Sequence, residues 1–169
     1  MNVTKEEEAE GLFLSIKNVV NKLEYTKVVC CPPHMYVNQV ARHVDHRNYR
    51  VGGQDAYPEE SGSRTGETSV LMMKNAGAEY IILGHSERRH LETKSDVARK
   101  VTAVLEHDMV PIICVGEEQR DRNWKKALTQ QLKDVFNRVP KKNPENIIIA
   151  YEPIWAISGE KKNPATSTE

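Results

Sequence analysis

The feature that most constrains the fold of this chain is the alternation of short apolar runs with segments of helical periodicity. The five apolar runs occupy residues 28–31, 49–52, 80–83, 110–115 and 147–151. Most of them lack the apolar–polar alternation of a half-exposed strand, and continuous β-branched residues are typical of strands covered on both faces. Strands of this kind alternating with helices predict right-handed crossovers and a parallel sheet.

The segments between the apolar runs carry helical signals. The clearest apolar stripe follows helical spacing and consists of Trp124, Leu128, Leu132, Val135 and Val139. Thr4 and Glu7 form a candidate capping box ahead of the first helix. Gly77 is placed to end a helix that begins near Thr68. The predicted order is one helix, four strand–helix units and a final strand, all within one domain over residues 1–169.

Two architectures accommodate this order, an open doubly wound sheet and a (β/α)8 barrel. The loops G-x-G-x-x-G and G-x-x-x-x-G-K-[ST], which bind nucleotides in many open sheets, do not occur in the sequence. Polar groups instead follow the ends of the apolar runs, at residues 34, 54–55, 85–87, 117–118 and 152. The carboxyl ends of parallel strands meet at the rim where barrel active sites lie. The expected fold class is therefore α/β, an incomplete (β/α)8 barrel with about five of its eight strands.

Composition excludes several functional classes. The sequence has 24 Lys and Arg and 24 Asp and Glu, a net charge of zero that gives no overall attraction to nucleic acid or to an anionic membrane. No apolar run approaches the ~18 residues that a membrane span needs, and no secretory signal is visible. Three cysteines lie in apolar runs, as buried, reduced thiols do. We therefore expect a cytoplasmic protein with neither nucleic-acid nor membrane partners.

Two segments carry a specific resemblance to a known family. Residues 80–89 read YIILGHSERR and residues 150–157 read AYEPIWAI. They resemble the motifs I-L-G-H-S-E-R-R and A-Y-E-P-[VI]-W-A-I-G-T-G-K of the triosephosphate isomerase family. Shorter matches lie, in family order, at residues 31–33, 51–55, 65–67 and 114–117. The resemblance implies a TIM barrel and an isomerase of glycolysis and gluconeogenesis that uses no cofactor and no metal. Such an enzyme interconverts dihydroxyacetone phosphate and glyceraldehyde 3-phosphate through an enediolate.

Glu152 and His85 are the candidate catalytic residues. Taken alone, a glutamate at a strand end is more often an ordinary solvated residue, and a lone histidine is more often structural. Triosephosphate isomerases are themselves the standard example of a carboxylate base beside a neutral histidine electrophile. The resemblance therefore implies that Glu152 moves the proton between two adjacent carbons and that His85 is the electrophile. His43 and His46 share i, i+3 spacing, but no third metal ligand is evident.

Two further residues receive roles through the resemblance. Glu87 would lie near the site and assist proton movement, although an acid in a first helical turn also stabilises that turn by itself. Ser158 would bind the substrate phosphate as part of a lid over residues 157–164. In this lid, Ser158-Gly159-Glu160 replaces the family's G-T-G.

The resemblance also implies a homodimer. In the family, the polar loop that matches residues 59–67 reaches into the partner subunit, which would place Thr65 at the partner's active site. Arg88 would pair with the partner's Glu67, and an ordinary surface ion pair is the alternative. Arg64 stands where the family usually has an aromatic residue.

The two ends of the sequence predict a fragment. Met1-Asn2 resembles the residues that follow the family's N-W-K motif, so the active-site lysine would lie one position before Met1. The last two strands of the family barrel have no counterpart, and an open sheet leaves its edges and interior layers uncovered. We expect essentially no turnover and poor stability from the chain alone. Two hypotheses stay open: the part of an isomerase that carries base and electrophile, and an inactive remnant that folds only with complementary segments.

Overall fold

Five strands form one parallel sheet whose spatial order follows the chain. The computed structural model describes residues 2–20, 22–44, 48–139 and 144–156. The strands are β1 (Val28–Cys30), β2 (Tyr49–Gly53), β3 (Tyr80–Leu83), β4 (Val110–Val115) and β5 (Ile148–Tyr151). Every neighbouring pair is parallel, with Tyr80 beside Val110 and Ile112 beside Ile148. The strand positions and the parallel sheet predicted from the apolar runs are confirmed.

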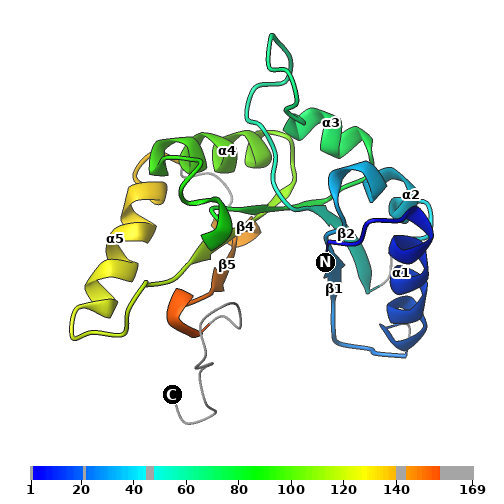
Figure 1. Ribbon diagram of the computed structural model, residues 1–169, viewed down its shortest axis with the longest axis horizontal. Helices are drawn as coiled ribbons and strands as arrows, with labels where there is room; N and C mark the ends of the chain where they lie inside the picture. The colour runs from blue at the N-terminus through cyan, green and yellow to red at the C-terminus, as the bar shows by residue number, and fades with distance from the viewer. Residues whose placement is uncertain (1, 21, 45–47, 140–143, 157–169) are drawn as a thin grey trace.

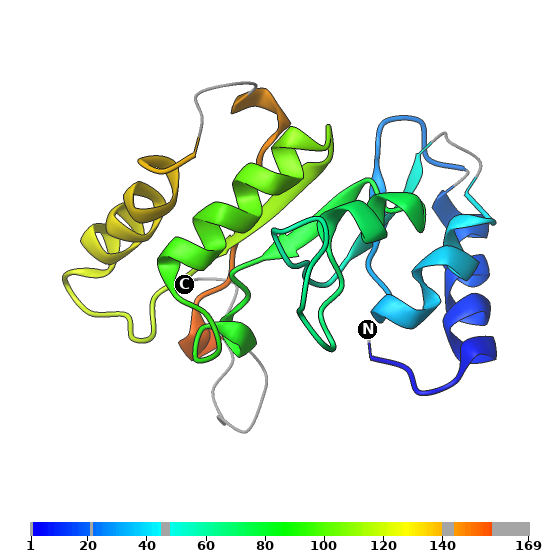
Figure 2. The same cartoon turned by 90° about the horizontal axis from the view of Figure 1, so that it is seen from above.

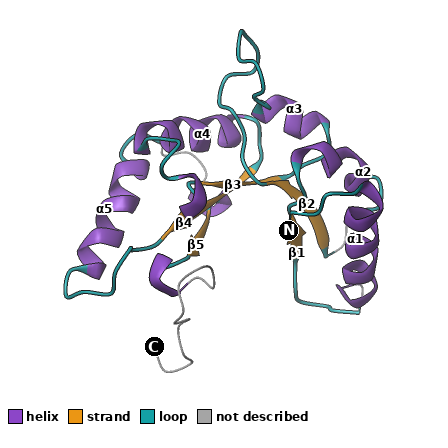
Figure 3. Cartoon of the chain, in the orientation of Figure 1, coloured by secondary structure: helices purple, strands orange, loops and turns teal. Residues whose placement is uncertain are grey.

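The helices lie on the convex side of an arched sheet, as Figures 1 and 3 show. They are α1 (Glu6–Val20), α2 (Val37–Ala41), α3 (Val70–Asn75), α4 (Lys94–Glu106) and α5 (Trp124–Phe136). The structure also describes four short 3-10 helices: η1 (His34–Tyr36), η2 (Ser86–Arg88), η3 (Pro144–Asn146) and η4 (Ile154–Ala156). This curled half-barrel is consistent with the incomplete TIM barrel expected from the sequence.

Local hydrogen bonds explain where two of the helices begin. Ser69 caps α3 by accepting from the N–H of Met72 at 3.1 Å, so this helix starts just after the Thr68 expected from the sequence. A full capping box lies ahead of α4, where Thr93 and Asp96 bond each other's backbone N–H groups. Near the N-terminus, the main-chain carbonyl of Thr4 accepts from the Tyr36 hydroxyl, which ties the start of α1 to η1.

The core lies between the sheet and its helices. The ring of Phe13 on α1 stacks on Tyr49 of β2 with centroids 4.2 Å apart, and Val101 of α4 and Ile81 of β3 are fully buried. Gly77, at φ 98°, ends α3 as predicted, and a Cβ there would lie 2.6 Å from Ala41. Within the described residues, none of the helices has the length and apolar character that crossing a membrane requires.

The concave side of the sheet is open. A cleft of about 950 Å³ is lined by side chains that include Cys31, His34, Asp55, His85 and Arg88. At one edge of the sheet, β5 exposes 42% of Ile148, 43% of Ile149 and 52% of Tyr151. The described part of the chain thus leaves apolar side chains uncovered along a strand edge.

Candidate active site

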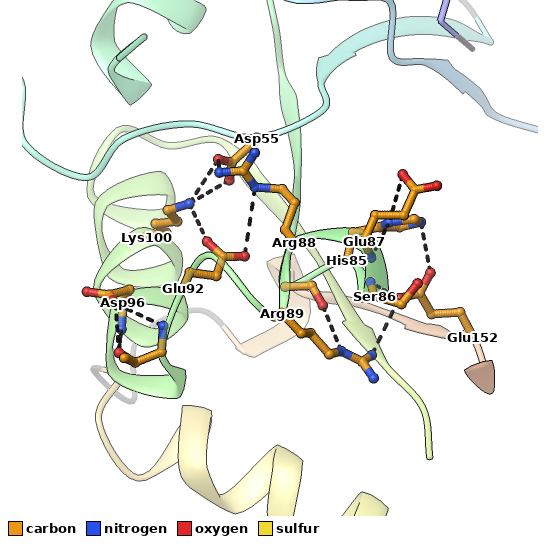
Figure 4. A network of polar contacts seen from close by, with 12 residues as sticks. Asp55, His85, Ser86, Glu87, Arg88, Arg89, Glu92, Asp96, Lys100 and Glu152 are labelled. Atoms are coloured by element: carbon orange, nitrogen blue, oxygen red, sulfur yellow. Dashed lines mark hydrogen bonds and ion pairs between the residues drawn. The ribbon is translucent and has the colours of Figure 1, made fainter. Parts of the chain in front are cut away.

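His85 and Glu152 meet at the rim formed by the carboxyl ends of β3 and β5. Nε2 of His85 lies 2.9 Å from Oε2 of Glu152 (Figure 4). The Glu152 side chain is 15% exposed and that of His85 is 34% exposed, and His85 is one of the residues that line the cleft. The structure therefore brings together the two residues that the sequence singled out.

The backbone around Glu152 is anchored to the end of β4. The N–H of Glu152 donates to the carbonyl of Val115 at 2.7 Å, and the N–H of Ile154 donates to the carbonyl of Glu117 at 2.9 Å. The second carboxylate oxygen of Glu152 accepts from the N–H of Ser86 at 2.7 Å. These bonds fix both the main chain and the side chain of Glu152.

His85 is oriented by the short helix that follows it. As the N-cap of η2, its Nδ1 accepts a hydrogen bond from the N–H of Glu87 at 3.4 Å. Because Nδ1 accepts, the proton of a neutral ring lies on Nε2, the atom that faces Glu152. The Glu87 carboxylate lies 3.7 Å from Nδ1 with its side chain 87% exposed. Glu87 is thus near the histidine, as expected, but on its solvent side.

Arg89 is a site residue that the sequence reasoning did not identify. Its guanidinium donates to the carbonyls of Gly84 at 3.3 Å and Gly116 at 2.8 Å, and its third contact is Glu152 at 3.4 Å. One planar side chain therefore joins the loops after β3, β4 and β5. The sequence did offer a signal for Arg89, because it is the last residue of the motif at residues 80–89 and directly follows η2.

Four charged residues form a buried charge cluster behind η2, shown in Figure 4. Lys100 of α4 contacts Asp55 at 2.8 and 2.9 Å and also bonds Glu92. Arg88 of η2 contacts Asp55 at 2.7 Å and Glu92 at 3.9 Å. The cluster ties the turn that carries His85 to the end of β2 and to α4. Sequence reasoning assigned only Arg88 here.

Glu117 holds the segment that follows Glu152. The residue is 4% exposed, and its carboxylate accepts from Trp155 Nε1 at 2.8 Å and from the Tyr151 hydroxyl at 2.9 Å. Burial acts to raise the pKa of Glu117, but these hydrogen bonds outweigh it and leave the pKa below its ordinary value. Glu117 therefore stays an anion under a strand end and a 3-10 helix.

The three cysteines, all of which the structure describes, form no disulfide and are buried or partly buried. Burial raises the pKa of Cys114 to about 12, with the nearby charge of Glu152 acting in the same direction. Burial likewise raises the pKa of Cys31 to about 12. Neither thiol is a thiolate nucleophile near neutral pH.

Several residues named from the sequence lie apart from this pair. Thr65 and Glu67 are exposed on the loop between β2 and α3, which projects from the body in Figure 1. Ser158 and the lid at 157–164 lie outside the described residues. Across the described part of the chain, no group of three or more His, Cys, Asp or Glu is placed to hold a metal ion.

Comparisons with known proteins identify the family. A family model described as triosephosphate isomerase matches residues 1–169. The chain is 42% identical over 159 residues to the triosephosphate isomerase of Alkaliphilus oremlandii (strain OhILAs), covering 91% of this chain and 64% of the relative. It is 41% identical over 166 residues to that of Clostridium botulinum (strain Loch Maree / Type A3), covering 95% and 66%. For Rhodopirellula baltica the identity is 39% over 166 residues, covering 95% and 65%.

The chain spans about two thirds of the length of these curated relatives. The family model nevertheless matches along the whole chain, and the arched parallel sheet is the corresponding part of a TIM barrel. On these grounds the chain belongs to the triosephosphate isomerase family.

Proposed function

We propose that His85 and Glu152 perform the proton transfer that interconverts dihydroxyacetone phosphate and glyceraldehyde 3-phosphate. The observation that carries this proposal is the 2.9 Å contact between Nε2 of His85 and the carboxylate of Glu152. A general base and a hydrogen-bond donor within this distance of each other can act on neighbouring atoms of one small substrate. The names of the relatives support the choice of triose phosphate as the substrate.

The proton transfers at the two substrate carbons and their oxygens use these two side chains. Glu152 removes a proton from the carbon beside the carbonyl, and the C–H electron pair forms the double bond of an enediolate. Nε2–H of His85 donates to the oxygen that gains the negative charge. His85 gives its Nε2 proton to that oxygen and takes the hydroxyl proton from the first carbon, whose oxygen becomes the new carbonyl. Glu152 returns its proton to the former carbonyl carbon, and the enzyme is left unchanged. No cofactor or metal enters this sequence.

Substrate binding must separate the two groups. At 2.9 Å, the Glu152–His85 contact leaves no space for a substrate carbon and oxygen between them. The Glu152 carboxylate must leave Nε2, so that Nε2–H can donate to the substrate instead. Ser86 N–H and Arg89 hold the other carboxylate oxygen and define the position from which the base moves.

A chimera tests the proposal independently of the chain's length. Residues 1–169 replace the matching segment of the Alkaliphilus oremlandii relative, and turnover of dihydroxyacetone phosphate is measured. We expect activity in the chimera and a loss of at least about 10²-fold in Glu152→Gln, the scale of general base catalysis. Glu118→Gln is the matched control, because Glu118 is exposed on the same rim. Equal activity of the two variants would refute the proposal.

We also propose supporting roles for Glu87 and Ser158. The Glu87 carboxylate, 3.7 Å from Nδ1 of His85, assists proton movement at the histidine. Ser158 binds the substrate phosphate from the lid. In the chimera, Glu87→Gln should lower kcat, whereas Ser158→Pro, which removes the backbone N–H, should raise KM. A KM unchanged in Ser158→Pro would remove that residue from the phosphate site.

An inactive remnant is the second candidate, and the apolar side chains exposed on β5 favour it. Ile148, Ile149 and Tyr151 would be covered if complementary strands paired beside β5. On this hypothesis the chain alone shows essentially no turnover and self-associates in sedimentation. Adding the remaining segments of a relative as separate chains should restore a single defined species. A monodisperse, fully active chain without added segments would exclude the remnant hypothesis.

We propose a homodimer built by the loop between β2 and α3. Thr65 and Glu67 are exposed on this loop. Arg64 folds back on it, with Arg64 5.4 Å from the Tyr57 ring centroid and 3.4 Å from Glu59. In the chimera, Thr65→Arg should shift sedimentation from dimer to monomer, and an unshifted dimer would exclude the loop from the interface.

We place the protein in the cytoplasm. The support is the state of its three cysteines, none of which forms a disulfide in the described structure, as is usual in a reducing compartment. Labelled protein found outside the cytoplasm on fractionation of the source cells would contradict this location.

A further inference from the structure

A cation lies between the two tryptophans of the chain. The guanidinium carbon of Arg120 is 5.3 Å from the ring centroid of Trp155 and 5.8 Å from that of Trp124. Arg120 belongs to the loop between β4 and α5, Trp124 begins α5, and Trp155 lies in η4. We call these three residues the indole clamp. In Figures 1 and 2 the loop before α5 and η4 lie next to each other, although they are far apart in the sequence.

The indole clamp is electrostatically consistent with its surroundings. A guanidinium near an indole face is attracted by the negative potential of the ring. The same Arg120 charge acts on the Glu117 carboxylate and lowers its pKa. Glu117 in turn accepts from Trp155 Nε1 at 2.8 Å. Trp155 is thus held in two ways: Glu117 accepts from its ring nitrogen, and Arg120 lies near its ring.

Trp155 is connected to Glu152 through a stiff segment. Only Pro153 and Ile154 separate them, and proline fixes one backbone angle of that segment. The N–H of Ala156 bonds the carbonyl of Pro153 at 3.0 Å, which closes the η4 turn. A displacement of the indole therefore moves the backbone that carries the Glu152 carboxylate. That carboxylate is the group in contact with His85.

We propose that Arg120 is a positioning residue for Glu152: by docking Trp155 between itself and Glu117, it fixes the segment that carries the carboxylate. Arg120 acts on Glu152 through Trp155. The description of Glu152 as a base rests on the proposed function. The docking of Trp155, and its effect on the Glu152–His85 contact, do not depend on it.

Intrinsic fluorescence isolates the indole clamp, because Trp124 and Trp155 are the two tryptophans of the sequence. Arg120→Met removes the charge and keeps much of the side-chain length, and Arg120→Lys restores the charge. Arg122→Met is the matched control, an exposed arginine two residues further along the same loop. We expect Arg120→Met to raise the fraction of acrylamide-accessible indole roughly two- to fivefold. Arg120→Lys should recover part of the change, and Arg122→Met should cause none.

The second readout reports on the active-site pair in the 169-residue chain itself. The 15N and 1H resonances of the His85 ring, assigned by comparison with His85→Gln, sense the Glu152 carboxylate. We expect them to shift in Arg120→Met and not in Arg122→Met. An unshifted His85 ring with a changed fluorescence would limit the indole clamp to a local role and overturn the proposal. Unchanged fluorescence would overturn it outright.

A second variant covers the case in which Arg120→Met does not fold, as judged by far-UV circular dichroism. Trp124→Leu removes one face of the indole clamp and leaves Trp155 as the remaining fluorophore. It should produce the same two changes, and a His85 ring that keeps its resonances would overturn the proposal. Because neither readout requires turnover, failure of the isomerase proposal is seen separately, in the chimera assay.

Discussion

The main-chain carbonyl of Glu152 packs directly on Gly116, where a Cβ would come within 2.0 Å of the carbonyl oxygen and 2.4 Å of its carbon. No rotamer change can relieve a clash with backbone atoms. Gly116→Ala must therefore push the end of β5 away from β4, and we expect a loss of about 1–3 kcal/mol in the free energy of unfolding. Urea denaturation measures it.

Gly11→Ala is the control for that substitution. Gly11 lies inside α1, and nothing is within 4 Å of a Cβ placed on it. Since alanine is favoured over glycine in a helix by about 1 kcal/mol, this variant should be more stable than the parent chain. A Gly116→Ala variant as stable as Gly11→Ala would contradict the observed packing of Glu152 on Gly116.

The buried charge cluster should be sensitive to loss of Lys100. Without that ammonium group, Asp55 and Glu92 share a buried site with Arg88 as the remaining cation of the cluster. We expect Lys100→Met to cost about 3–5 kcal/mol of unfolding free energy, the usual result of removing one partner from a buried ionic group. Lys94→Met removes an exposed lysine from the same helix and should cost at most about 1 kcal/mol. Equal losses in thermal or urea unfolding would show that Lys100 is not buried in a charge network.

Alkaline pH should destabilise the folded chain through its thiols. Burial raises the pKa of Cys31 and Cys114 to about 12 and also raises that of Cys30, whereas an unfolded thiol has a pKa of about 8.5. Between these values the unfolded chain has lost thiol protons that the folded chain keeps. The free energy of unfolding should therefore fall as the pH rises above about 8.5 and show no thiol contribution below it. A triple Cys→Ala variant should lose this slope in urea titrations, and an unchanged slope would assign it to other groups.

Much of the fold was predictable because its strands are marked by continuous β-branched runs. Residues 80–83 and 110–115, identified as apolar runs, are the observed β3 and β4. Helix starts were less predictable, since side-chain capping competes with alternative partners. The candidate box of Thr4 and Glu7 stays a prediction, whereas the full box ahead of α4, at Thr93 and Asp96, was not singled out from the sequence.

The candidate site likewise contains residues that the sequence identified and residues that only the fold revealed. His85 and Glu152 were found through the motifs that contain them, and because each lies just past the end of a strand, the parallel sheet brings them to one rim. Arg89 was missed because two of its three partners are main-chain carbonyls, which leave no mark in a sequence, and the third, Glu152, is 63 residues away. Lys100 had a usable signal, since it shares the apolar face of α4 with Val97 and Val104. Its partner Asp55 is 45 residues away, so the pairing required the fold.

Proton exchange at carbon tests the central claim most directly. In D2O, the chimera carrying residues 1–169 should incorporate deuterium into dihydroxyacetone phosphate, followed by 1H NMR. Glu152→Asp withdraws the carboxylate by ~1 Å and should slow the exchange on the order of 10²-fold, while Glu118→Asp should leave the rate unchanged. Exchange at the same rate in both variants would contradict the assignment of Glu152 as the base.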